Sequence, residues 1–239
     1  MKRLAVVVCA ASSMWLLACE NVDSEDVMTS GVYADISATA DGAGQSLVKA
    51  SLRVGGGASN TYLDLMGNDK LVASQDTTDK DMVKRTLLGA VWYEATFDAD
   101  AADTPFKVAF TRTVDDGAPE STLTLPTPFA ITVPAADAQF SRASDDITVT
   151  WDPGSSSDTM HLTADGDCIQ IWTKDLDGDA GTAVIPHAEI VAHENQEATT
   201  CTVTVTVGRR RAGTLDTGYG EGGVVWGIQQ RTIKIKSAP

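Results

Sequence analysis

The chain has 239 residues, of which 33 are acidic and 18 basic, so its formal net charge is −15. A surface this acidic repels the phosphates of nucleic acid and the headgroups of anionic lipids, so neither is expected as a partner. Such a surface keeps a protein soluble beside a membrane. Attraction of divalent cations is the alternative consequence of the same charge.

The first predicted element is an export signal over residues 1–18. Lys2 and Arg3 precede an uncharged, apolar stretch over residues 4–17, which is the arrangement of a signal peptide. The stretch is shorter than the about 20 apolar residues of a membrane-spanning helix, and acidic rather than basic residues follow it. We therefore expect this segment to be removed on export.

The signal ends in a four-residue motif. Leu16-Leu17-Ala18-Cys19 resembles the lipobox of bacterial lipoproteins, and the whole chain is similar to lipoproteins of Gram-negative bacteria. The resemblance implies that Cys19 becomes the lipidated first residue of the mature chain and anchors it in a membrane. Glu20, in place of the aspartate that retains many such proteins in the inner membrane, implies the outer membrane, on its periplasmic face or at the cell surface. The alternative is an ordinary secretory signal with a coincidental cysteine.

Processing at this motif changes the net charge of the chain and the number of cysteines that can pair. The mature chain keeps 16 basic and 33 acidic residues, a net charge of −17. Cys9 leaves with the signal and lipid consumes Cys19, which leaves Cys168 and Cys201. Because exported compartments are oxidising, we expect these two to form a disulfide, worth roughly 3–4 kcal/mol in the chain-entropy model. A metal pair or free thiols are the alternatives, although no nearby histidine spacing completes a zinc site.

The mature chain fits two domains of about 100 residues each better than one. Residues 19–29 form an expected lipidated, acidic tether. A proline-rich break at residues 126–128 divides the remainder into an N-terminal β-sandwich domain, 30–125, and a C-terminal one, 126–239.

Alternating apolar and polar residues predict that the N-terminal domain is all-β. Val32, Ala34 and Ile36 alternate with polar neighbours, and Phe106 and Val108 share one face of a later segment. This is the pattern of half-buried strands in an antiparallel sheet. The strands expected in this domain are 32–39, 46–54, 61–65, 71–74, 86–88, 91–97 and 106–112.

The C-terminal domain repeats this pattern, and the alternation of threonine and valine over residues 202–207 excludes a helix there. Its expected strands are 129–133, 147–151, 160–163, 169–173, 183–185, 201–207 and 224–235. Ile131–Pro134 and Asp146–Pro153 resemble the immunoglobulin and fibronectin type III superfamily, which implies that Trp151 packs in the core. Seven strands agree with that resemblance. We therefore expect two tandem antiparallel β-sandwich domains of the immunoglobulin-like kind.

No catalytic residues are expected. The chain has three histidines, His161, His187 and His193, and it lacks the Gly-x-Ser-x-Gly motif of many hydrolases. The segment that begins at His193 is similar to a metalloprotease motif, but Glu197 stands where the second imidazole is needed.

One acidic segment is the candidate metal site. Asp175, Asp177 and Asp179 alternate as the carboxylates of a calcium loop do. Ala180 and Pro186 stand where the helix-loop-helix form needs a glycine and a bidentate glutamate. A solvated turn is the main interpretation and a calcium site is the alternative; no other cofactor is expected.

Arg209, Arg210 and Arg211 follow a predicted strand, at an expected hairpin tip. The interpretations are a solvated turn or a docking patch for anionic lipid headgroups or an acidic partner. Aromatic residues are expected in the cores, with an exposed sugar-stacking platform as the alternative. The residues concerned are Trp92, Tyr93, Trp151, Trp172, Tyr219 and Trp226.

These features favour a membrane-anchored, non-catalytic envelope lipoprotein that acts as a binding, adhesion or structural module. Its expected partners are the membrane, through the lipid on Cys19, and an unknown protein or glycan of the envelope. An envelope hydrolase acting on glycan or peptide and an accessory subunit of an envelope complex are the alternatives.

Overall fold

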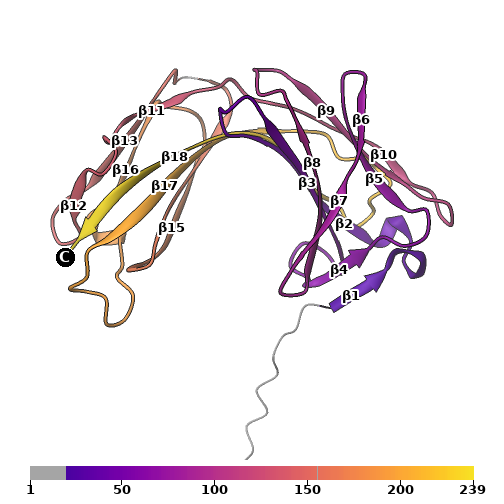
Figure 1. The fold of residues 1–239 in the computed structure, drawn as a ribbon, viewed down its shortest axis with the longest axis horizontal. Coiled ribbons are helices and arrows are strands. Elements are labelled where there is room, and N and C mark those ends of the chain that lie inside the picture. The colour runs from indigo at the N-terminus through magenta and orange to yellow at the C-terminus, as the bar shows by residue number, and fades with distance from the viewer. Residues whose placement is uncertain (1–19, 155) are drawn as a thin grey trace, which may run out of the picture.

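The computed structural model describes residues 20–154 and 156–239, so the expected signal peptide and Cys19 lie outside the described residues. The protein is built almost entirely of β-strands, which form two β-sandwiches (Figure 1). The prediction of an all-β fold with two sandwiches is confirmed. Within the described ranges, no helix has both the length and the apolar composition needed to cross a membrane.

The first sandwich packs two sheets face to face. One sheet contains β1 (Glu20–Asp23), β2 (Val32–Ala40), β3 (Ser46–Val54), β4 (Thr61–Asp64), β7 (Val83–Leu87) and β8 (Ala90–Phe97). The other contains β5 (Lys70–Gln75), β6 (Thr78–Asp81), β9 (Pro105–Thr111) and β10 (Ala118–Thr124). The predicted alternation in β2 is confirmed, because Val32, Ala34 and Ile36 are all fully buried.

The second sandwich has an immunoglobulin-like strand order. One sheet contains β11 (Ala130–Val133), β13 (Ile147–Asp152) and β16 (Thr182–Ile185). The other contains β14 (Thr159–Gly166), β15 (Ile169–Leu176), β17 (Cys201–Ala212) and β18 (Gly223–Ala238), with the short β12 (Gln139–Ser141) parallel to the end of β18. Leaving β12 aside, the first, second and fifth strands in chain order are β11, β13 and β16. They form one sheet, and the other four strands form the sheet that packs against it. Trp151 lies in this core, as the resemblance implied.

The long strand β18 joins the two sandwiches into one sheet. Its first half pairs in parallel with β2, and most of its length pairs antiparallel with β17, which completes an 11-stranded sheet. Figure 1 shows this sheet along the underside of an arch, with the smaller sheets on the outer side at either end. Gly227 permits the close packing at the joint, because a Cβ there would lie 1.9 Å from the carbonyl oxygen of Thr124.

Each sandwich has its own hydrophobic core, and the first core includes residues from late in the chain. Tyr219 and Val225 pack among the side chains of the N-terminal strands. The division into domains 30–125 and 126–239 stays a prediction. The structure adds that the chain returns to the first sandwich after β17 before it completes the second.

Residues 20–29 do not form the expected tether, and that prediction is wrong for this segment. β1 pairs in parallel with β4, and the side chains of Ser24 and Thr29 are buried. The guanidinium of Arg112, which is fully buried, donates to the main-chain oxygens of Ser24 and Val27 and to Thr29 Oγ1. The acidic segment is therefore an integral part of the first sandwich.

Candidate functional site

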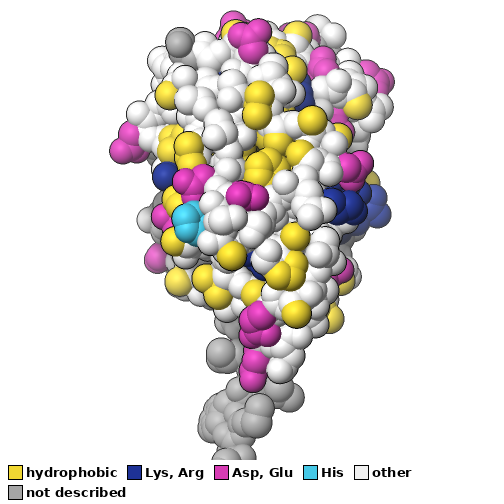
Figure 2. Space-filling model, turned by 90° about the vertical axis from the view of Figure 1, so that its left-hand side faces the viewer, with side chains coloured by type: hydrophobic (Ala, Val, Ile, Leu, Met, Phe, Trp, Pro, Cys, Tyr) yellow, Lys and Arg dark blue, Asp and Glu magenta, His cyan; other side chains and the backbone are white. Residues whose placement is uncertain are grey.

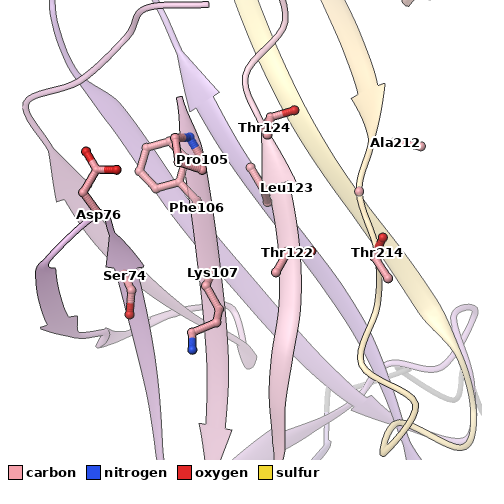
Figure 3. A pocket seen from close by; sticks show the side chains of 11 residues that line it. Ser74, Asp76, Pro105, Phe106, Lys107, Thr122, Leu123, Thr124, Ala212 and Thr214 are labelled. Carbon is pink, nitrogen blue, oxygen red and sulfur yellow. The ribbon is translucent and has the colours of Figure 1, made fainter. Parts of the chain in front are cut away.

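A polar groove lies on the outer face of the four-stranded sheet of the first sandwich (Figure 3). Strand register places Lys107 of β9 between Ser74 of β5 and Thr122 of β10. Thr122 in turn is opposite Thr214, in the segment that follows β17. Because directly opposed residues have Cβ atoms about 4.5–5.5 Å apart, these four side chains form one row across four neighbouring segments.

The groove has a volume of about 440 Å³, and it is also lined by Asp76, by the segment 212–214 and by Pro105, Phe106, Leu123 and Thr124, so apolar surface lies beside the polar row. Thr122 and Thr214 exchange two main-chain hydrogen bonds of 2.8 Å, which fix this wall against β10. Lys107 lies 3.6 Å from Glu120 in an exposed pair, a contact worth about 0–1 kcal/mol, so the ammonium remains available to a ligand. Hydroxyl, ammonium and carboxylate groups in one groove suit a polar ligand bound by hydrogen bonds.

The arginine run lies inside a strand, so the prediction of a hairpin tip at Arg209–Arg211 is wrong. β17 continues to Ala212, and the three arginines pair with residues 227–229 of β18. Strand alternation turns Arg209 and Arg211 toward the interior, while Arg210 faces the other way. The arginine run therefore pairs with the part of β18 that also pairs with β2, where the two sandwiches join.

Arg209 is fully buried beside the linker and the second core. Its guanidinium forms an ion pair with Asp179 at 2.6 Å and donates to the carbonyl oxygens of Thr127 at 2.7 Å and Pro153 at 2.5 Å. It also lies over the Phe129 ring, 4.9 Å from the ring centroid. One arginine thus binds the linker between the domains, a loop of the second sandwich and a buried carboxylate.

Arg211 connects the two sandwiches directly. It binds Asp158 of the second sandwich at 2.8 and 3.1 Å, and Asp103 and the Leu125 carbonyl oxygen beside the first sandwich at 2.6 and 3.1 Å. The hydrogen bonds that Arg211 donates to Asp158, and to a smaller extent to Asp103, raise the pKa of Arg211, although burial opposes the charge. Rotation of one sandwich against the other would break these charge-assisted hydrogen bonds, so they stiffen the arch.

A second hollow, of about 390 Å³, lies beside this joint and is lined in part by Trp226, Arg210 and Arg211. Burial lowers the pKa of Arg210, and the charge of Asp175, 3.5 Å away, partly offsets this effect. Both arginines in the hollow therefore already have acidic partners within the chain. The docking-patch hypothesis for the arginine run stays a prediction.

The candidate calcium residues Asp175, Asp177 and Asp179 border a hollow of about 510 Å³. The Asp179 carboxylate is buried, accepts a 2.6 Å hydrogen bond from Trp151 and faces Arg209. Burial opposes its ionisation, but the hydrogen bond from Trp151 and the charge of Arg209 contribute to a pKa below the usual value. Across residues 20–154 and 156–239, no group of three ligand-type side chains is placed to hold a metal ion. Figure 2 shows acidic side chains dispersed over the second-sandwich end of the molecule. The calcium site stays a prediction.

Two of the histidines lie beside carboxylates. Nδ1 of His161 is 2.6 Å from Asp175, and Nδ1 of His187 is 2.7 Å from Asp146. In the part of the chain that the structure describes, neither imidazole is hydrogen-bonded to a serine, threonine or cysteine side chain. A histidine with an adjacent nucleophile, the arrangement that covalent catalysis requires, is not formed by these two residues.

The predicted disulfide between Cys168 and Cys201 is confirmed, with a Cα–Cα distance of 5.9 Å. It ties the chain just before β15 to the start of β17, two strands that β14 separates in the sheet. The loop over residues 186–200, between β16 and β17, is thereby held to the second sandwich. This bond lies at the opposite end of β17 from the arginine joint.

The aromatic residues mainly support packing. Tyr93 and Tyr219 are buried in the first core, and Trp151 and Trp172 in the second. Trp92 is partly exposed, and Lys49 Nζ lies 4.9 Å from the centroid of its ring. Core packing therefore accounts for the four buried aromatic residues.

Comparison with known proteins finds no matching protein family and no related curated protein. Among solved structures, the chain is similar to the FN1–FN3 domains of chicken CNTN1, with 10% identity over 86% of this chain and 65% of that one, at a TM-score of 0.29. It is also similar to the adhesin InvE of Yersinia pseudotuberculosis, with 13% identity over 87% and 59% of the two chains, at a TM-score of 0.25. The chain thus spans less than two thirds of the length of either structure.

No sequence motif identifies the groove residues. Ser74, Lys107, Thr122 and Thr214 are ordinary polar residues, spread over 140 positions of the chain, and none belongs to a motif. Only Ser74 and Lys107 fall within strands that alternation predicts. Their register, and the return of the chain to pair Thr214 with Thr122, come from the tertiary structure.

Proposed function

We propose that this chain is a non-catalytic, membrane-anchored module of the bacterial envelope whose polar groove binds a protein or glycan partner. The observation that carries the proposal is the row formed by Ser74, Lys107, Thr122 and Thr214. Four side chains with hydrogen-bonding groups, from four segments separated in sequence, lie in line in an exposed groove. A partner that matches this row gains several hydrogen bonds at once.

The stiffness of the arch supports a binding role. The groove is lined by strands and by a segment whose main chain is hydrogen-bonded to β10. Arg211 and the shared strand β18 hold the second sandwich against the first. A groove held in this way loses little conformational entropy when a partner binds, which favours affinity.

The anchoring part of the proposal rests on the motif Leu16–Cys19, and Glu20 directly after it supports an outer-membrane location. Mass spectrometry of the N-terminal peptide should show a chain that begins at Cys19 and carries acyl groups. A Cys19→Ser variant should leave the membrane fraction, because a chain without acyl groups has lost its anchor. Sedimentation of the native protein in a density gradient should place it with the outer membrane. An unmodified chain in the soluble fraction would refute the anchor.

Photocrosslinking in intact cells tests the groove. A photoreactive phenylalanine analogue at Thr122 should give a discrete adduct, while the same residue at Thr148, an exposed threonine of β13 on the other sandwich, should not. Lys107→Met should weaken the adduct at Thr122 about tenfold, since a hydrogen bond to a charged group is worth about 1.5–3 kcal/mol. Equal adducts at both positions, or none at Thr122, would contradict the proposed binding face.

A further inference from the structure

The turn between β7 and β8 exposes two large apolar side chains. Leu87 is 63% exposed and Leu88 is 91% exposed, and all five residues of β7 are exposed. Leu87 pairs with Ala90, so Leu88 and Gly89 form a two-residue hairpin turn. Neighbouring exposed apolar side chains are candidates for contact with a protein or a membrane.

The backbone at this turn favours a different residue. Leu88 has φ of +49° and Gly89 has φ of +87°, the left-handed conformations of a type I′ hairpin turn. Asparagine, aspartate and glycine occupy the first position of such turns readily, whereas a leucine with positive φ is uncommon. A leucine that is both exposed and conformationally unfavourable points to a role outside the folding of this chain.

This turn lies at the end of the sandwich where the described chain begins. With its amide oriented to donate, the Asn21 side-chain nitrogen is 3.1 Å from the carbonyl oxygen of Gly89. Figure 1 shows the turn between β7 and β8 beside the start of β1. Cys19 precedes Glu20 directly in the sequence, so the proposed anchor is attached at the start of β1, the strand whose Asn21 contacts the turn.

The rest of this end is mixed in character, because the side chains of Glu20 and Asp23 are exposed and an uncharged loop lies beside them. Glu20 donates its main-chain N–H to the carbonyl oxygen of Asn60 at 3.3 Å, which places the uncharged loop 55–60 beside it. The basic residues of β7 already have partners, because Lys84 pairs with Asp64 and Arg85 pairs with Glu94. A charged group without a partner would oppose entry of the turn into lipid, and neither lysine nor arginine of β7 is such a group.

We propose that Leu87 and Leu88 insert into the acyl-chain region of the membrane that holds the lipid on Cys19. This inference rests on the anchoring part of the proposed function. The ten residues after Cys19 are packed into the sandwich rather than forming a tether, so the anchor holds this end of the domain at the bilayer. The lipid and the two leucines then make two separate contacts, which fix the orientation of the arch on the membrane.

The test attaches the chain to lipid artificially, so that it does not depend on natural lipidation. A chain of residues 19–239 has Cys19 as its free thiol, because Cys168 and Cys201 are bonded to each other. It is coupled through Cys19 to maleimide lipid in phosphatidylcholine vesicles whose acyl chains carry bromine. Leu88→Trp and Ile171→Trp variants are compared with the unmodified sequence; Ile171, on β15 of the other sandwich, is 66% exposed and serves as the matched control.

Bromine in the acyl chains should quench the tryptophan at position 88 and leave the one at position 171 at its emission in unbrominated vesicles, since interfacial insertion buries apolar groups by about 5–10 Å. Equal emission of the position 88 tryptophan in brominated and unbrominated vesicles would overturn the proposal. A blue-shifted emission of Leu88→Trp in solution, with a concentration-dependent increase in mass, would also overturn it by showing that a second copy covers the turn. Lipidation of native Cys19 is decided separately, by the mass of its N-terminal peptide.

Discussion

Substitution of Arg209 by methionine should destabilise the protein strongly. The change removes the ion pair with Asp179, both of whose side chains are at most 1% exposed, and the two hydrogen bonds to Thr127 and Pro153. Breaking a buried pair by removing one partner costs about 3–5 kcal/mol, because it leaves an uncompensated buried charge. At about 2–4 °C per kcal/mol for a chain of this size, the melting temperature should fall by roughly 6–20 °C.

Urea denaturation followed by tryptophan fluorescence measures this effect. Trp151 donates a hydrogen bond to Asp179, so its emission reports on the surroundings of the Arg209–Asp179 pair. Arg210→Met is the matched control: Arg210 faces the opposite side, and its 3.5 Å pair is with Asp175, whose side chain is 77% exposed, so the substitution should cost less than about 1 kcal/mol. The double variant Arg209→Met, Asp179→Asn should recover part of the loss. A single Arg209→Met variant within about 1 kcal/mol of the wild type would refute the argument that the joint is held by a buried charge pair.

Leu88→Asn should raise the stability of the chain in solution by about 0.5–1 kcal/mol, since asparagine tolerates positive φ; a lower melting temperature would contradict the turn conformation. Replacing Cys168 and Cys201 together by serine should lower the unfolding free energy by about 3–4 kcal/mol in the chain-entropy model, measured in urea; an unchanged midpoint would argue against the bond. Because the pKa of Asp179 is lowered in the folded protein, its contribution is complete above its unfolded pKa, about 3.9, and is lost as the pH falls through the folded value. Asp179→Asn should therefore lose less stability than the wild type between about pH 5 and pH 2, and parallel curves would contradict this. Millimolar calcium should shift the melting temperature by less than about 1 °C, because Arg209 already neutralises Asp179; a shift of several degrees would instead support a bound ion.

Much of the fold could be predicted from local patterns. Alternation of apolar and polar residues located most strands, because side chains of a strand point to opposite faces whatever its partners are. The strands that it missed include β6, which has no buried residue, and β10, in which a register shift between Ala118 and Ser121 interrupts the alternation of buried residues. The disulfide was predicted from the number of cysteines and from the oxidising compartment. Once Cys9 and Cys19 are assigned to the signal and the lipid, Cys168 and Cys201 are the two cysteines that remain.

Tertiary structure decided the parts that concern function. Arg209–Arg211 look like a solvated turn because their sequence is charged, yet β17 continues through them and buries Arg209 against Asp179, a residue 30 positions away. The segment 20–29 looks like a tether because it is acidic, yet Arg112 binds its main chain.

The groove and the exposed turn also combine residues that the sequence shows with an arrangement that only the tertiary structure gives. The row from Ser74 to Thr214 exists only through the register of four segments, and sequence alone contains no information on register between distant strands. The sequence shows that Leu87 and Leu88 are apolar, and the structure shows that they are exposed. Their position beside the start of the described chain depends on the pairing of β1 with β4. The sequence by itself determined most of the strand segments and the pair of cysteines that form the disulfide, because those properties are local or depend on counting. Which side chains meet depended on contacts between residues far apart in the chain, of which the pairing of β18 with both β2 and β17 is one.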